Sequence, residues 1–64
     1  QIAGVSDILG ITPNEGRMFA CEVKSLKGKV SQYQQDFLDR VNKEGGIGFV
    51  ARCVDDAKKE LFLL

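Results

Sequence analysis

The sequence predicts an α/β domain with the element order ββαβα, in which helices pack on a mixed sheet. Three observations lead to this prediction: a turn tetrad between two apolar stretches, an amphipathic helical pattern after them, and a short apolar run followed by a second helical pattern. With only 64 residues, the chain is expected to form a single domain over residues 1–64. A domain this small buries about 60% of its unfolded surface, so a partner subunit is the expected source of extra stability.

The first two strands are expected at residues 5–11 and 18–24, because both stretches are apolar and suit a pleated, half-buried surface. Between them stands the tetrad Pro-Asn-Glu-Gly, which is typical of a four-residue hairpin loop. Pro13 presets its own φ angle, and Gly16 can adopt a positive φ. An antiparallel pair is therefore predicted at the start of the domain.

The register of this hairpin decides which side chains meet. In one register, Thr12 faces Arg17 across the loop. Asp7 then lies directly opposite Glu22, and Lys24 shares their face because side chains repeat every second residue, with opposing Cβ atoms about 5 Å apart. Two carboxylates this close repel each other, and a hard divalent cation such as Mg²⁺ would relieve the repulsion. The alternative is an exposed ion pair between Glu22 and Lys24, which contributes only about 0.2–1 kcal/mol.

The third element is predicted to be a helix that begins after Ser31 and ends before Gly45-Gly46. Ser31 and Gln34, three positions later, fit a capping box. Gln34 also falls inside the apolar stripe of this helix, where its amide is either tied to the helix cap or directed at the site beside Lys24. The stripe consists of Val30, Tyr33, Phe37, Leu38 and Val41.

The last two elements are a strand at residues 47–53 and a helix opened by Asp55 or Asp56. The strand is apolar on both faces, which is typical of an internal strand, and the connection through the helix implies a parallel, right-handed crossover. The end of the last helix, residues 61–64, has more apolar groups than one face can bury. Such a patch commonly marks a contact with another chain or with a missing segment. The stripe of this helix consists of Val54, Ala57, Leu61 and Leu64.

Composition excludes several kinds of site. The chain has no histidine, which excludes a Cys₂His₂ zinc site and any Ser-His or Cys-His nucleophile pair. Cys21 and Cys53 both fall in predicted strands, so free core thiols are favoured over a disulfide, and an intracellular setting follows. No apolar run approaches the ~20 residues of a membrane helix, so no membrane association is expected.

The net charge of the chain does not favour a polyanionic partner, whereas one local group of basic residues does. Nine basic and nine acidic residues cancel, whereas phosphate-binding proteins usually carry a basic excess. A basic lip beside an acidic pocket would suit a metal-dependent enzyme that acts on a polyanion, and a solvated loop of lysines is the alternative. The basic residues gathered around the second strand and its exit loop are Arg17, Lys24, Lys27 and Lys29.

The order of the motifs gives a family resemblance over nearly the whole chain. The motifs are Gly4-Val5-Ser6-Asp7, Glu22-Val23-Lys24, Ser31-Gln32-Tyr33-Gln34 with its amphipathic helix, and the strand from Ile47 to Arg52. Together they resemble the VRR-NUC (virus-type replication-repair nuclease) family of the PD-(D/E)xK superfamily, whose fold is restriction-endonuclease-like. Two departures stand out. Ser6 is found where proline is usual, and a preceding helix with a further acidic residue is expected to be missing from the N-terminal side.

The resemblance implies a metal-dependent DNA endonuclease that uses Mg²⁺, with Mn²⁺ able to substitute. Similar stand-alone phage proteins suggest cleavage of branched DNA such as Holliday junctions, by a homodimer in the cytoplasm of a bacterial or phage-infected cell. A non-catalytic DNA-binding or oligomerising module with the same fold is the alternative. The implied residues are Asp7, Glu22, Lys24 and Gln34 for catalysis, Asp7, Glu22 and the Val23 carbonyl for the metal, and Arg17, Lys27 and Lys29 for DNA.

Overall fold

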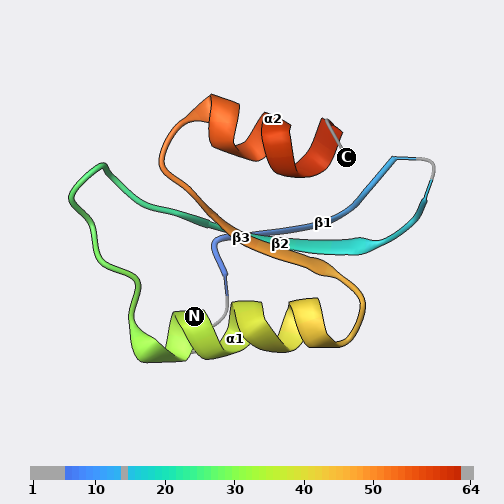
Figure 1. Cartoon of the computed structure of the whole chain (residues 1–64), viewed down its shortest axis with the longest axis horizontal. Helices are drawn as coiled ribbons and strands as arrows, with labels where there is room; N and C mark the ends of the chain where they lie inside the picture. Colours follow the sequence, from blue (N-terminus) through green and yellow to red (C-terminus); the bar gives the residue numbers. More distant parts are fainter. Residues whose placement is uncertain (1–5, 14, 63–64) are drawn as a thin grey trace.

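A three-stranded mixed sheet lies between two helices in the computed structural model, which describes residues 6–13 and 15–62 (Figure 1). The strand order is β1-β2-β3, with β1 antiparallel and β3 parallel to β2. Helix α1 covers one face of the sheet and α2 the other (Figure 1). This arrangement confirms the predicted α/β fold. The elements are β1 (Ile8–Ile11), β2 (Met18–Val23), α1 (Gln32–Lys43), β3 (Ile47–Ala51) and α2 (Val54–Phe62).

The hairpin has the predicted register. Thr12 N donates a hydrogen bond to Arg17 O at 2.7 Å, and Arg17 N donates to Thr12 Oγ1 at 3.0 Å, so the two residues close the loop together. Gly16 has a φ of 67°, as the predicted loop requires. Strand β1 is shorter than expected, because Asp7 lies in a bend, and the predicted start of the strand at Val5 lies outside the described residues. The paired residues are Ile8 with Cys21, Leu9 with Ala20, Gly10 with Phe19, and Ile11 with Met18.

Helix α1 packs on the sheet through a narrower stripe than the sequence predicts. Leu38 and Val41 are buried and form a cluster with Ala20 of β2, with Phe37 at its margin. Tyr33 is 71% exposed, so its assignment to the stripe was wrong. Tyr33 lies in the first turn of α1, before the part of the helix that carries the buried Leu38 and Val41.

Strand β3 lies at an edge of the described sheet, although its apolar character on both faces suggested an internal strand. It is nevertheless covered on both faces, because α1 packs on one side and α2 on the other. One donor and one acceptor of its open edge are satisfied by a side chain. Asn42 Nδ2 donates to Gly48 O at 3.0 Å, and Gly48 N donates to Asn42 Oδ1 at 2.8 Å.

The second cluster of the core lies under α2. Ala57 and Leu61 pack there against Cys21 and Phe49. Val54 is 71% exposed because it is the first residue of the helix, so the predicted stripe was wrong at this position, and Leu64 lies outside the described residues. No helix in the described ranges is both long and apolar enough to cross a membrane.

The two cysteines are both free, as predicted, but only one is a core residue. Cys21 is buried, and this burial raises the pKa of its thiol. Cys53 is exposed, because β3 ends at Ala51 and Cys53 lies in the connection to α2. Its assignment to a buried strand was therefore wrong.

Candidate functional site

The hairpin brings Asp7 and Glu22 together where β1 begins and β2 ends. Glu22 is the fifth residue of the six-residue strand β2, and continuing the observed pairing by one residue sets Asp7 opposite it. The Asp7 side chain reaches across the end of β2, where its Oδ2 accepts a hydrogen bond from Val23 N at 3.1 Å. The carboxylate pair predicted from the sequence is therefore present.

Glu22 is the most unusual member of this pair. It is only 1% exposed, and its Oε1 atom has no hydrogen-bond partner among the described residues. A buried carboxylate oxygen without a partner is costly, and such groups at functional sites often await a ligand. The interpretation of Glu22 as half of an exposed ion pair with Lys24 is wrong, because the ion pair in the described part of the chain joins Arg40 to Glu44.

The two carboxyl groups have opposite pKa shifts. Burial raises the pKa of Glu22 above its ordinary value of 4.5, and hydrogen bonding and repulsion from Asp7 raise it further. Hydrogen bonding to Glu22, followed by the bond from Val23 N, lowers the pKa of Asp7. The opposite pKa shifts are those of two interacting carboxyl groups, of which Glu22 holds its proton more tightly than Asp7 does. A divalent cation between the two carboxylates would offset their repulsion and so favour loss of the proton from Glu22.

The pKa shift of Glu22 predicts how stability depends on pH without metal. The folded-state pKa is raised, so the folded chain binds the proton more tightly than the unfolded chain does. The free energy of unfolding should therefore fall as pH rises from about 4.5 through the raised pKa, and then level off. Thermal unfolding in EDTA at several pH values measures this decline, and Glu22→Gln should flatten it. An unchanged decline in that variant would assign it to other groups.

Lys24 lies beside the pair. It follows β2 directly, its N–H donates to Ala51 O at 3.1 Å, and its side chain is half-buried. The alternation of side chains places Lys24 and Glu22 on the α1 side of the sheet, where Ala20 packs. Its positive charge acts to lower the pKa of both Asp7 and Glu22. The structure thus brings an amine near two carboxyl groups.

Gln34 is tied to the helix cap. Its Oε1 accepts a hydrogen bond from Ser31 N at 2.9 Å, and its own N–H donates to Ser31 Oγ at 3.1 Å. This reciprocal pair is the predicted capping box. Of the two interpretations that the sequence left open, the structure shows the cap, and it leaves the Nε2 donor group of the side-chain amide for any further role.

The basic residues do not form one group. Lys27 and Lys29 are exposed in the loop after β2, close in sequence to Lys24. Arg17 precedes β2, and six strand residues separate it from Lys24, a span of about 20 Å. Its guanidinium is used there, because Nε donates to Gly45 O at 3.0 Å and Nη2 to Gly46 O at 3.3 Å. The basic lip predicted from the sequence thus lacks Arg17.

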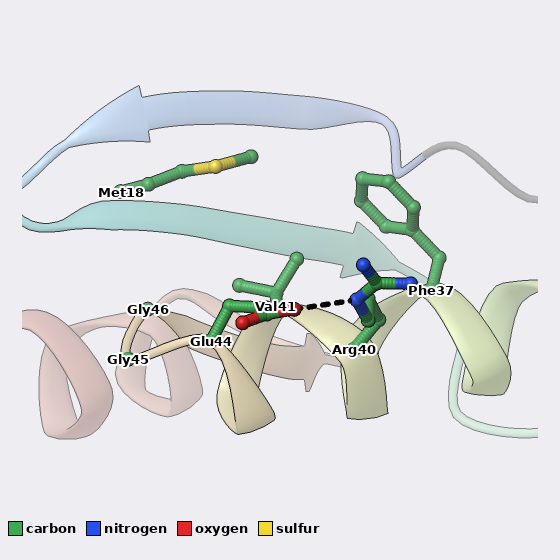
Figure 2. A pocket seen from close by; sticks show the side chains of 7 residues that line it. All are labelled: Met18, Phe37, Arg40, Val41, Glu44, Gly45 and Gly46. Carbon is green, nitrogen blue, oxygen red and sulfur yellow. Dashed lines mark hydrogen bonds and ion pairs between the residues drawn. The ribbon is translucent and has the colours of Figure 1, made fainter.

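A shallow pocket of about 380 Å³ lies at the same end of β2 as Arg17, away from the carboxylates (Figure 2). Figure 2 shows Met18 and Phe37 on one side of it and the Arg40–Glu44 ion pair along the helix. It contains neither Asp7 nor Glu22 in its lining, so it has no part in the chemistry of the pair. The lining residues are Met18, Phe37, Arg40, Val41, Glu44, Gly45 and Gly46.

The donors at the site suit a hard cation that keeps several waters. Two carboxylates converge, and one of them has an unpartnered buried oxygen. In the ranges that the structure describes, no three histidine, cysteine or acidic side chains gather as a metal-binding group. Among the described residues, Asp7 and Glu22 are therefore the two carboxylate ligands for a cation at this site.

Comparison with known proteins decides the family. The family model of the VRR-NUC domain matches residues 2–55 of the 64. The chain belongs to the VRR-NUC family. This is a nuclease-type family, and the match includes the Asp7, Glu22 and Lys24 positions. Neither the curated proteins nor the solved structures contain a match to this VRR-NUC chain.

Two residues near the site have an environment that the sequence pattern did not indicate. Arg52 appears in the sequence only as part of the third strand, but its side chain reaches the loop after β2. Ser6, beside Asp7, is buried, and its Oγ has no partner among the described residues. The sequence offered one sign of the role of Arg52: it is a charged residue at the end of an otherwise apolar predicted strand.

Proposed function

We propose that this VRR-NUC chain is a Mg²⁺-dependent endonuclease that hydrolyses phosphodiester bonds of DNA. The observation that supports this most is the buried, unpartnered Oε1 of Glu22 opposite Asp7, in a nuclease-type family. A protein gains no stability from such an oxygen in the absence of a ligand. A cation-binding role explains both its burial and its lack of a partner.

The residues divide the chemical work among them. Asp7, Glu22 and the Val23 carbonyl would hold the cation, which would acidify a water molecule and polarise the phosphoryl oxygen. Lys24 orients that water or offsets the negative charge that grows on the phosphate in the transition state. Gln34 positions the lysine or the water through its Nε2 group, while its Oε1 keeps the helix cap. Mn²⁺, which also prefers oxygen ligands, should substitute for Mg²⁺.

The direct test is cleavage of supercoiled plasmid and of a synthetic four-way junction, each with Mg²⁺, with Mn²⁺ and with EDTA. We expect nicking that depends on the cation, and faster cleavage of the junction than of a matched linear duplex. Binding of DNA without cleavage under every condition would instead support a non-catalytic DNA-binding module. That alternative draws on the presence of only two carboxylates at the described site.

Lys27 and Lys29 are proposed to grip the DNA backbone. Replacing both with Ala should weaken binding to all sequences and reduce the magnitude of the salt slope by about 2 at most, because each phosphate contact contributes about 0.9. Fluorescence anisotropy at several salt concentrations, without divalent cation, measures this slope. Lys58→Ala together with Lys59→Ala, on α2, is the matched control. If the salt slope of the variant with both Lys27→Ala and Lys29→Ala equals that of the unsubstituted chain, the two lysines only form part of a solvated loop.

The branched substrate is proposed together with a homodimer, in the cytoplasm of a bacterial or phage-infected cell. A closed two-fold pair would set two sites against two strands. Phe62 at the end of α2 is 65% exposed, which leaves a large apolar group for a partner chain. The two free cysteines suit a reducing compartment.

Light scattering at micromolar concentration should therefore report about 14 kDa, twice the chain mass of 7.0 kDa, by two-fold symmetry. Phe62→Ser should shift this value towards the monomer, because it removes apolar area from the interface. Tyr33→Ser, which changes another exposed aromatic residue on the other helix, should not. A folded monomer at high concentration would remove the dimer and the reason for preferring junctions over duplex DNA.

A further inference from the structure

The loop between β2 and α1 is built around a tight turn. Gly28 N donates a hydrogen bond to Ser25 O at 3.1 Å, which closes a four-residue turn with Leu26 and Lys27 at its tip. Leu26 is 82% exposed, and Lys27 and Lys29 are exposed as well. The turn thus projects a short basic segment from the end of the strand that carries Glu22.

One guanidinium nitrogen of Arg52 donates hydrogen bonds to the backbone of this turn. Arg52 Nη1 lies 2.6 Å from Ser25 O and 2.7 Å from Gly28 O, to which it donates hydrogen bonds, and 3.4 Å from Leu26 O. Hydrogen bonds from a charged donor are shorter and roughly twice as strong as neutral ones. Three carbonyls of one turn therefore converge on one cationic group, and the turn has little freedom to rotate away from it.

Arg52 is itself fixed by its neighbours. Its N–H donates to Asp56 Oδ2 at 2.8 Å, in the first turn of α2, and this hydrogen bond is the main cause that lowers the pKa of Asp56. The residue before it, Ala51, accepts the hydrogen bond from Lys24 N. The start and the tip of the loop are thus both tied to the end of β3. A route of hydrogen bonds runs from α2 to the turn.

We propose that Arg52 is a positioning residue, which holds the turn at residues 25–28 beside the Asp7–Glu22 site so that Lys27 and Lys29 meet the DNA backbone together. The inference rests on the proposed nuclease function and adds to it a residue that touches no DNA. Its physical basis is preorganisation: a turn that is already ordered loses less conformational entropy when DNA binds. The positions of both lysines then depend on the Arg52 guanidinium.

The first measurement needs no DNA. Amide hydrogen exchange of Gly28 reports whether its bond to Ser25 O persists. Arg52→Met, which keeps an unbranched apolar stem, should speed this exchange by about tenfold or more, and Arg52→Lys should have a smaller effect. Arg17→Met is the matched control, because Arg17 also donates to two loop carbonyls, but at the other end of β2. Unchanged Gly28 exchange in Arg52→Met would overturn the proposal.

The second measurement separates positioning from direct contact with DNA. Replacing an arginine that contacts one phosphate should reduce the salt slope by about 0.9. Replacing a residue that positions two phosphate-binding lysines should reduce it by about 1.8. Arg52→Met should therefore reduce the slope as much as Lys27→Ala and Lys29→Ala together, and it should add nothing further in that double variant. Arg40→Met, at the exposed ion pair on α1, should leave the slope unchanged.

The outcomes are distinguishable. A slope reduction near 0.9 that adds fully to the lysine substitutions would make Arg52 a phosphate ligand and overturn its positioning role. Failure of the unsubstituted chain to bind DNA would overturn the proposed function, and the DNA part of this inference with it. Gly28 exchange would still decide in that case whether Arg52 orders the turn.

Discussion

Glu22→Gln should abolish Mg²⁺-dependent DNA cleavage while the chain keeps its fold. The amide has nearly the size of the carboxylate, so the buried packing is retained, but the negative charge that would hold the cation is lost. Loss of a single oxyanion-hole donor typically costs about 10²–10³-fold in rate, and the loss of a charged metal ligand should cost at least as much. Plasmid nicking with Mg²⁺ measures the effect. Glu44→Gln, at an exposed residue in the ion pair with Arg40, is the control and should cleave normally.

The same variant should also distinguish the stability that bound Mg²⁺ adds from the stability of the fold without metal. With Mg²⁺ at 100 times its dissociation constant, the unsubstituted chain should gain about 2.7 kcal/mol in free energy of unfolding, and Glu22→Gln should gain almost none. In EDTA at neutral pH the variant should be at least as stable as its parent, because a buried carboxylate with a raised pKa is removed. Cleavage at the parental rate by Glu22→Gln would refute the metal assignment.

Local rules explain why the hairpin and the helix start were predictable. The turn tetrad fixes the register through the closing pair of Thr12 and Arg17, and the register alone sets Asp7 opposite Glu22. The capping box of Ser31 and Gln34 depends on two residues three positions apart. Each of these features is decided by neighbours within the chain.

The features that the sequence did not show depend on contacts between distant segments. Glu22 is 1% exposed in the folded chain, and no local pattern distinguishes it from an exposed glutamate. The hydrogen bonds of Arg17 and Arg52 reach loops 24 to 29 positions away. Arg17 braces the loop before β3, and Arg52 holds the turn after β2. Long-range side-chain contacts of this kind need the fold first.

Gly48 lies at a close contact between α1 and β3. A Cβ placed at Gly48 would lie 2.6 Å from the backbone oxygen of Leu38 and 3.1 Å from its Cα. The obstacle is helix backbone, which does not rotate aside as a side chain does. The two hydrogen bonds between Gly48 and the Asn42 side chain depend on the same approach. The sequence shows this glycine only as one of three near the start of the strand.

Gly48→Ala should therefore destabilise the chain more than any substitution proposed above. Forcing α1 away from β3 costs about 1–3 kcal/mol or more for overpacking alone, before the loss of the Asn42 hydrogen bonds, and each kcal/mol lowers the Tm of a domain this small by about 4–8 °C. Gly16→Ala is the control, because Gly16 has a φ of 67° and a Cβ at this position would meet nothing within 4 Å, so it should lose only about 1–2 kcal/mol through strain. Thermal unfolding followed by circular dichroism measures both. A Tm for Gly48→Ala that is no lower than that of Gly16→Ala would mean that α1 does not approach β3 this closely.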